Sequence, residues 1–166
     1  MLRKIVLVSA LSVVVPVSAA PQDEVYIPLG VELWGGLKTG MSKDEVNALG
    51  NEKKFELVKD CRVSLNPRYK DKVLVGVTIA SRWTMAYNRC AELVKRSLVA
   101  KYGESVSVES FPATSYSTFG PYVVEKWLTD DVVISLGWGG SGGDRLKFIS
   151  YEPRMIVEEA ELIDNL

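Results

Sequence analysis

The chain has 166 residues, of which 47% are hydrophobic and 25% are charged, and its formal net charge is -1. This is the composition of one globular domain, and it excludes a disordered or collagen-like chain. A chain so close to neutral lacks the clustered positive charge that binds phosphate backbones, so we expect no nucleic-acid partner.

Residues 1–19 have the pattern of a secretory signal peptide. Arg3 and Lys4 precede an apolar run over 5–15, and Val17-Ser18-Ala19 is typical of a cleavage site. That run is shorter than the roughly 20 residues of a membrane-spanning helix, and no cysteine follows it to carry a lipid at the new N-terminus. We therefore expect cleavage after Ala19, a single mature domain over 20–166, and a soluble periplasmic or secreted protein with no transmembrane segment and no lipid anchor.

The first predicted helix follows an extended segment over 25–29. Ser42 is the expected N-cap, and Glu45, three residues later, completes a capping box. Met41 can pack on Val46 as a hydrophobic staple, and Gly50 stands where a left-handed C-cap belongs. These signals predict a short helix of about two turns.

Three strands are predicted next, over 55–60, 61–65 and 72–80, with a turn at Asn66-Pro67 and the charged stretch 68–71. A second helix is predicted over 84–102, because apolar and small residues recur there at a spacing of 3.6 residues. Gly103 ends it. Cys90 lies on the apolar side of this helix.

The chain contains two cysteines, Cys61 and Cys90. Export places them in an oxidising compartment, so we predict one disulfide that joins the second helix to the strand beginning at Cys61. The alternative is a redox-active or metal-binding pair. It is less well supported, because the spacing is not Cys-x-x-Cys and no histidine completes a zinc site.

The second half is predicted to contain strands over 106–109, 122–129, 132–138 and 145–152, of which the first has the weakest signal. Asp130-Asp131 is a predicted tight hairpin, and Pro153 opens a predicted acidic helix over 153–163. Without the weak strand over 106–109 and the short terminal helix, the predicted order is helix, three strands, helix, three strands. We therefore expect an α+β fold in which two helices pack on one face of an antiparallel sheet whose other face is more open.

A glycine-rich stretch lies between the last two strands. Residues 137–142 match Gly-x-Gly-x-x-Gly, but a strand follows where dinucleotide binding needs a helix. Residues 139–147 match one repeat of the calcium-binding β-roll, which needs neighbouring repeats to complete its cage. A flexible hairpin loop explains the stretch better, and we expect no cofactor and no metal.

The four tryptophans and seven tyrosines allow two interpretations. They can fill the core, or some of them can form an exposed aromatic surface on the open sheet face that anchors a partner protein. The candidate contact residues under the second interpretation are Trp34, Tyr116, Tyr122, Trp127 and Trp138.

Catalytic residues cannot be named from the sequence. Histidine is absent, Ser-x-x-Lys does not occur, and nothing places two carboxylates across a cleft. We therefore expect a protein that is not an enzyme.

The segment from Gly36 to Gly50 contains Gly40-Met41-Ser42, then Glu45-Val46, and ends in Leu49-Gly50. This segment resembles the superfamily of β-lactamase inhibitor proteins and the BamE-like (SmpA/OmlA) outer-membrane assembly lipoproteins. The resemblance implies an antiparallel sheet with helices on one face and a function in binding proteins. The chain departs from the lipoproteins in having no lipid-anchor cysteine and an extra half, and the inhibitory residues of the inhibitors have no match, so no functional residue is carried over.

Together these observations predict an exported, non-catalytic module that binds another exported or envelope protein through its sheet face and glycine-rich loops. It would act as an inhibitor or immunity protein, or as an accessory in envelope assembly. The alternative is a cell-envelope hydrolase or a small-ligand-binding protein.

Overall fold

The computed structural model describes residues 28–50, 54–58, 61–81, 89–112, 121–140 and 145–155. The predicted signal peptide over 1–19, Tyr116, the first residues of the predicted second helix (84–88) and most of the predicted C-terminal helix lie outside these ranges.

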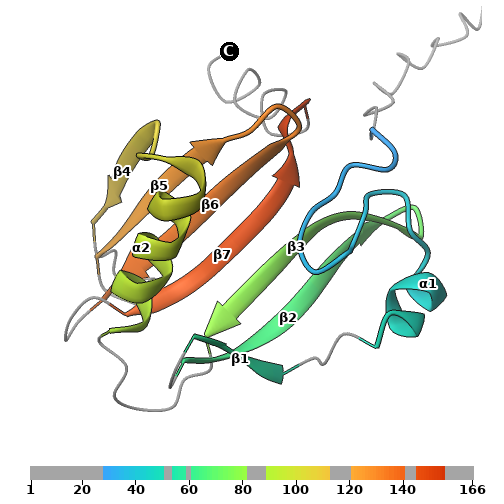
Figure 1. Ribbon diagram of the computed structural model, residues 1–166, viewed down its shortest axis with the longest axis horizontal. Coiled ribbons are helices and arrows are strands. Elements are labelled where there is room, and N and C mark those ends of the chain that lie inside the picture. The colour runs from blue at the N-terminus through green and yellow to red at the C-terminus, as the bar shows by residue number, and fades with distance from the viewer. Residues whose placement is uncertain are drawn as a thin grey trace, which may run out of the picture.

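One antiparallel sheet of seven strands, in the order β1-β2-β3-β7-β6-β5-β4, dominates the structure (Figure 1). Among the described strands, β3 and β7 are the only two that pair in the sheet without being consecutive in the chain. Their pairing joins the two halves of the chain. The strands are β1 (Lys54–Val58), β2 (Cys61–Lys70), β3 (Val73–Ser81), β4 (Ser107–Phe111), β5 (Tyr122–Leu128), β6 (Val132–Gly139) and β7 (Leu146–Pro153).

The predicted fold class is wrong. The structure is mainly a seven-stranded sheet with two short helices, α1 (Lys43–Ala48) and α2 (Cys90–Tyr102), and not a helix-strand-helix-strand arrangement with two helices packed on one face. Four strands follow α2, because the weakly predicted segment near 106–109 forms the edge strand β4. The helix-start signals around Ser42 are local, and they produce a helix of only six residues, too short to form a layer over the sheet.

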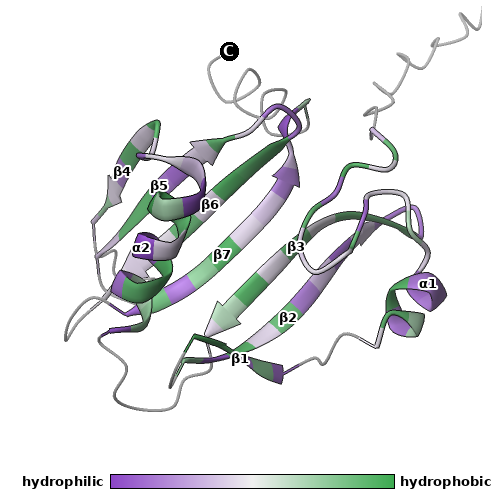
Figure 2. Ribbon diagram, in the orientation of Figure 1, coloured by the Kyte–Doolittle hydropathy of each residue, from purple (hydrophilic) through white to green (hydrophobic). Residues whose placement is uncertain are grey.

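The core lies on the face of the sheet that α2 crosses in front of β5, β6 and β7 (Figure 1). Alternate residues of the strands point to this face, and hydrophobic and hydrophilic residues alternate along β2 and β7 (Figure 2). Cys90, Ala91, Val94 and Leu98 of α2 are buried against it, and Leu33 and Leu37 of the N-terminal segment join the same cluster. The opposite face carries small polar residues on adjacent strands, among them Thr78, Ser150 and Ser135.

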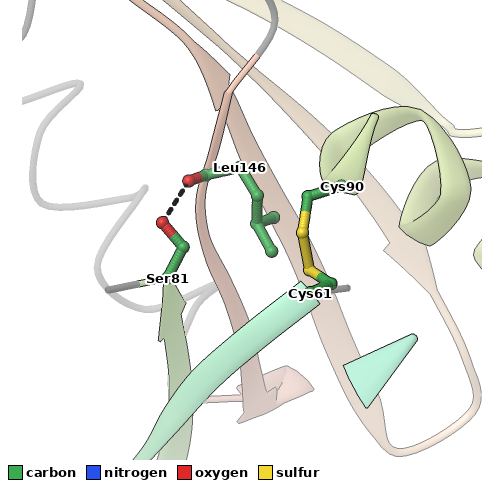
Figure 3. The surroundings of a disulfide bond; sticks show 4 residues. All are labelled: Cys61, Ser81, Cys90 and Leu146. Carbon is green, nitrogen blue, oxygen red and sulfur yellow. Dashed lines mark hydrogen bonds between the residues drawn. A yellow bond between two sulfur atoms is a disulfide. The ribbon is translucent and has the colours of Figure 1, made fainter. Parts of the chain in front are cut away.

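The predicted disulfide is confirmed. Cys61, the first residue of β2, is bonded to Cys90, the first residue of α2, with 5.5 Å between their Cα atoms (Figure 3). At the same end of the sheet the Ser81 hydroxyl donates to the Leu146 carbonyl at 2.7 Å and ties β3 to β7. A disulfide of this kind fits a protein of the periplasm or the extracellular space.

Local signals of the first helix are confirmed. The Glu45 backbone N–H donates to the Ser42 hydroxyl, and the Ser42 backbone N–H donates to the Glu45 carboxylate at 2.7 Å, so both halves of the capping box form. The hairpin at Asp130-Asp131 is also present, since Leu128 pairs with Val133 and the Thr129 backbone N–H donates to the Val132 carbonyl.

The turn between β2 and β3 lies later than predicted. Asn66 and Pro67 continue β2, and the chain reverses at Asp71 and Lys72, both of which have positive φ angles (50° and 70°) as a two-residue hairpin turn requires. Proline is tolerated at position 67 because β1 pairs only with residues 61–64 of β2. The side of β2 that faces β1 therefore needs no backbone N–H donor at position 67.

Candidate functional site

A hollow of about 470 Å³ opens at the end of the sheet where β4 and β6 finish and β5 begins. Tyr122 and Trp138, two of the predicted contact residues, both line it. The other lining residues are Ser110, Phe111, Pro112, Pro121, Val123, Gly139 and Gly140. The lining is mainly apolar and contains three aromatic side chains, which suits an apolar or aromatic group of a partner.

Phe111 and Tyr122 form a stacked pair in this hollow, which we call the tip hollow. They are register partners on β4 and β5, and their ring centroids lie 4.8 Å apart with an interplanar angle of 11°. Phe111 is exposed. Sequence reasoning missed Phe111, although its position at the end of a strand and directly before Pro112 could have marked it as an edge aromatic.

Two glycines of the predicted glycine-rich loop have structural roles in β6. A Cβ atom on Gly137 would lie 2.3 Å from a ring carbon of Phe148, and one on Gly139 would lie 2.9 Å from the Tyr122 Cα. Gly139 also has a φ of 122°, which side chains disfavour. These glycines therefore allow β5 and the Phe148 ring to approach β6 closely. Residues 141–144 of the loop lie outside the described ranges.

Trp138 is held by a buried carboxylate. Its indole Nε1 donates to Glu125 Oε1 at 2.9 Å, and the same oxygen accepts from Lys95 Nζ of α2 at 2.7 Å. Ser105 Oγ lies 3.3 Å from the other oxygen, and Lys95 Nζ lies 5.8 Å from the centroid of the Trp138 ring. Glu125 is 1% exposed, and a buried carboxylate is costly unless donors compensate it. The three donors from Lys95, Trp138 and Ser105 supply that compensation. One wall of the tip hollow, the Trp138 indole, is therefore held in place by a buried side chain.

The strand that borders the tip hollow has an unoccupied edge. Among the described strands β4 pairs only with β5, and alternate backbone N–H and C=O groups of such an edge strand point away from the sheet. Val108 on β4 and Val106 directly before it are 61% and 60% exposed. Exposed β-branched residues on an unpaired edge are typical of a strand that accepts another strand.

The structure does not bring all the predicted contact residues together. Trp127 is 1% exposed and its Nε1 donates to the Gly103 carbonyl at 2.9 Å, so it is a core residue, and its assignment to a contact surface is corrected. Trp34 lies elsewhere, stacked on Phe55 of β1 with 4.9 Å between ring centroids. Tyr116 lies outside the described residues.

Within the described ranges no three histidine, cysteine, aspartate or glutamate side chains gather where they could hold a metal ion. Residues 141–144, which the calcium interpretation includes, lie outside the described ranges. The dinucleotide interpretation fails in the structure as it did in the sequence, because β7 follows the glycines.

Over the same part of the chain, no helix is long and apolar enough to cross a membrane. Comparison with known proteins adds no family to these observations: no protein-family model matches the chain, and no similar protein was found among curated proteins or solved structures.

Proposed function

We propose that this protein is an exported, non-catalytic module that binds an extended segment of another exported or envelope protein along β4, with the tip hollow receiving an apolar side chain. The observation that carries the proposal is the exposed edge of β4, where Val106 and Val108 are more than half exposed and the strand ends in the Phe111–Tyr122 pair. Backbone pairing along such an edge supplies affinity, and a pocket at its end supplies specificity.

The buried polar cluster supports binding rather than catalysis. Glu125 is engaged by Lys95, Trp138 and Ser105, and this arrangement orients the indole of Trp138 instead of presenting a carboxylate to a substrate. A rigid aromatic side chain oriented in advance loses little entropy on binding, which is a property of contact residues with a large effect on affinity.

The periplasmic or secreted location and the relationship to the β-lactamase inhibitor and BamE-like superfamily are also parts of this proposal. Support for a periplasmic or secreted location comes from the signal-peptide pattern of residues 1–19 together with the Cys61–Cys90 disulfide. Support for a relationship to the β-lactamase inhibitor and BamE-like superfamily comes from the capped turn over Gly36–Gly50 alone. An inhibitor or immunity role and an assembly role both use protein binding, so the proposal covers either.

The test is quantitative capture of a partner from envelope extract by the oxidised mature protein, residues 20–166. Val108→Lys places a charge on the exposed edge without disturbing the core, and lysine is a residue that natural edge strands use to prevent pairing. Leu128→Lys is the matched control, because Leu128 is 45% exposed but lies at the far end of β5.

We expect one stoichiometric partner that the control retains and Val108→Lys loses, and we expect the backbone amides of 107–111 to exchange more slowly in the complex. A partner that both lysine variants retain equally would contradict binding along β4. A complex in which residues 107–111 gain no protection would contradict it as well.

A further inference from the structure

A second cavity, of about 340 Å³, lies between α2, β1, β7 and the N-terminal segment around Trp34, and it shares no lining residue with the tip hollow. Much of its wall is apolar and is formed by Val94 and Leu98 of α2, Leu57 of β1 and Ile149 of β7. Pockets for small molecules have volumes in this range, and they combine a mainly apolar lining with a few polar groups that orient the ligand.

The charged groups at one end of this cavity compensate each other. Glu32 of the N-terminal segment lines it together with Lys101 and Tyr102 of α2, and the Lys101 ammonium lies 4.9 Å from the centroid of the Tyr102 ring. The Tyr102 side chain, and the Glu32 carboxylate to a smaller extent, raise the pKa of Lys101 because they favour its charged form. The described lining therefore carries no net charge, and a charged ligand would be buried there without a free counterion.

The same cavity contains a buried hydroxyl that lacks a partner. Tyr151 of β7 lines the cavity and is 7% exposed, and no described residue forms a hydrogen bond with its hydroxyl. Ser97, another lining residue, differs in this respect, because its hydroxyl donates to the Leu93 carbonyl at 3.0 Å. Burial, with a smaller contribution from Tyr102, raises the pKa of the Tyr151 hydroxyl, so the group is a protonated donor at neutral pH. A buried donor without an acceptor is costly and rare in folded proteins.

We infer that this cavity binds an uncharged small molecule with an apolar chain and one terminal oxygen, which accepts a hydrogen bond from the Tyr151 hydroxyl while the chain lies along α2 towards Val94. Lining residues of α2 run from Val94 to Tyr102, a distance of about 12 Å at 1.5 Å per residue. The oxygen supplies the acceptor that Tyr151 lacks, and the chain covers the apolar wall. The compensated charges of Glu32 and Lys101 disfavour an ion. This inference is independent of the proposed β4 interface.

The probe is 1-octanol, titrated into the oxidised mature protein and followed by calorimetry and by the NMR signals of the Trp34 indole and the Ile149 amide. Octanoate and octylammonium have the same chain with a negative or a positive end, so they test whether the cavity selects an uncharged ligand. We expect saturable binding of octanol with shifts at Trp34 and Ile149, and binding weaker by about tenfold for both ions.

Tyr151→Phe removes the hydroxyl alone. We expect it to weaken octanol binding by about tenfold, the effect of one hydrogen bond. Without ligand, its melting temperature should equal or exceed that of the wild type, because the hydroxyl has no partner to lose. Arg96→Met is the matched control and should bind octanol as the wild type does, because Arg96 is on α2, is exposed and does not line the cavity.

Two further variants each leave one uncompensated charge at the polar end. Glu32→Gln should bind octanoate more tightly than the wild type does, and Lys101→Met should bind octylammonium more tightly. If neither variant changed the affinity for its ion, the polar end of the ligand would not lie beside Glu32 and Lys101, which contradicts the inference.

The inference is overturned by an absence of saturable octanol binding, by shifts confined to the tip hollow, or by an ion that binds as tightly as octanol. Equal octanol affinity of the wild type and Tyr151→Phe would overturn it as well. A lower melting temperature of ligand-free Tyr151→Phe would show that the hydroxyl already has a partner, with the same consequence.

Discussion

The two edge strands of the sheet are both five residues long, but their side chains are held very differently. On β1, Phe55 stacks on Trp34, and Leu57 and Val58 pack against the core. The next strand begins with Cys61, which the disulfide bonds to α2. On β4, by contrast, Val108 is 61% exposed, and Phe111 contacts only its neighbour Tyr122 among the aromatic residues of the described chain.

This difference separates a structural edge from an edge that is available for binding. Apolar residues of β1 contribute to folding because the N-terminal segment and α2 cover them. Val108 of β4 contributes little to folding, since water still reaches most of its surface. An edge that keeps exposed valines invites pairing, so natural proteins normally block such edges unless they are used.

The largest expected effect comes from removing the disulfide with the double variant Cys61→Ala, Cys90→Ala. The bridge closes a loop with a sequence separation of 29, so the chain-entropy relation gives a loss of about 3.6 kcal/mol in the free energy of unfolding. Denaturant unfolding measures the loss. Hydrogen exchange should show that amides of β1 lose more protection than those of β4, and equal losses at both edges would contradict the comparison.

A smaller effect is expected from a matched truncation at each edge. Phe55→Ala removes the stack on Trp34 and leaves a gap at a half-buried position, so we expect a loss of about 2 kcal/mol. Val108→Ala should change the free energy of unfolding by less than about 0.5 kcal/mol, because its side chain is mostly in solvent. If thermal and denaturant unfolding gave Val108→Ala the larger loss, β4 would be a structural edge after all.

Replacing the buried carboxylate of Glu125 beside the tip hollow is expected to lower the free energy of unfolding by less than either change above that affects β1. Glu125→Gln keeps the size of the side chain but weakens its bonds with Lys95 and Trp138, and we expect a loss of about 1.5 kcal/mol. The fluorescence of Trp138 should shift as its indole loses a charged acceptor. An unfolding curve and a spectrum identical to those of the wild type would show that Glu125 does not orient Trp138.

The smallest expected effect is local to α1 and depends on pH. Hydrogen bonds from Ser42, the backbone N–H first and the hydroxyl second, lower the pKa of Glu45 below 4.5. A carboxyl whose pKa is lower in the folded state stabilises the fold above its unfolded pKa, and this stabilisation is lost as the pH falls through the folded value. Amide exchange in α1 should therefore accelerate as the pH falls below 4.5 relative to amide exchange elsewhere in the chain.

Glu45→Gln provides the control for that measurement. The glutamine side chain can still accept the bond from the Ser42 backbone N–H, but it does not titrate. The variant should keep α1 and lose its pH dependence in this range. If it retained the same dependence as the wild type, Glu45 would not be the responsible group.

Signals that depend on neighbouring residues in the chain were readable from the sequence. The Ser42–Glu45 capping box and the Asp130-Asp131 hairpin are of this kind, and the disulfide was predicted because the chain has two cysteines and a predicted signal peptide. The prediction of a turn at Asn66-Pro67 was wrong because these residues pair with β3, and this pairing overrides the local turn signal. The fold class was wrong because helix signals report where helices begin and not how much of the sheet they cover.

Exposure of the aromatic residues could not be read from periodicity. Trp127 and Trp138 lie on strands and point to the same face of the sheet, since Trp127 pairs with Ile134 and Trp138 lies four residues along β6. Trp127 is buried and bonded to Gly103 at the end of α2, whereas Trp138 reaches the tip hollow. The pattern of one strand identifies a face but does not say what covers it. The same limit hid Phe111, whose exposure depends on β4 being the last strand of the sheet.

The central claim is that β4, and not β1, is the edge that a partner uses. Its most direct test is site-specific photo-crosslinking in envelope extract, with a photoreactive residue at position 108 on β4 or at position 54 on β1, both of which are exposed. We predict a discrete crosslinked partner from position 108, abolished when Phe111→Ala is added, and none from position 54. Equal adducts from both edges, or an adduct from position 54 alone, would contradict the claim.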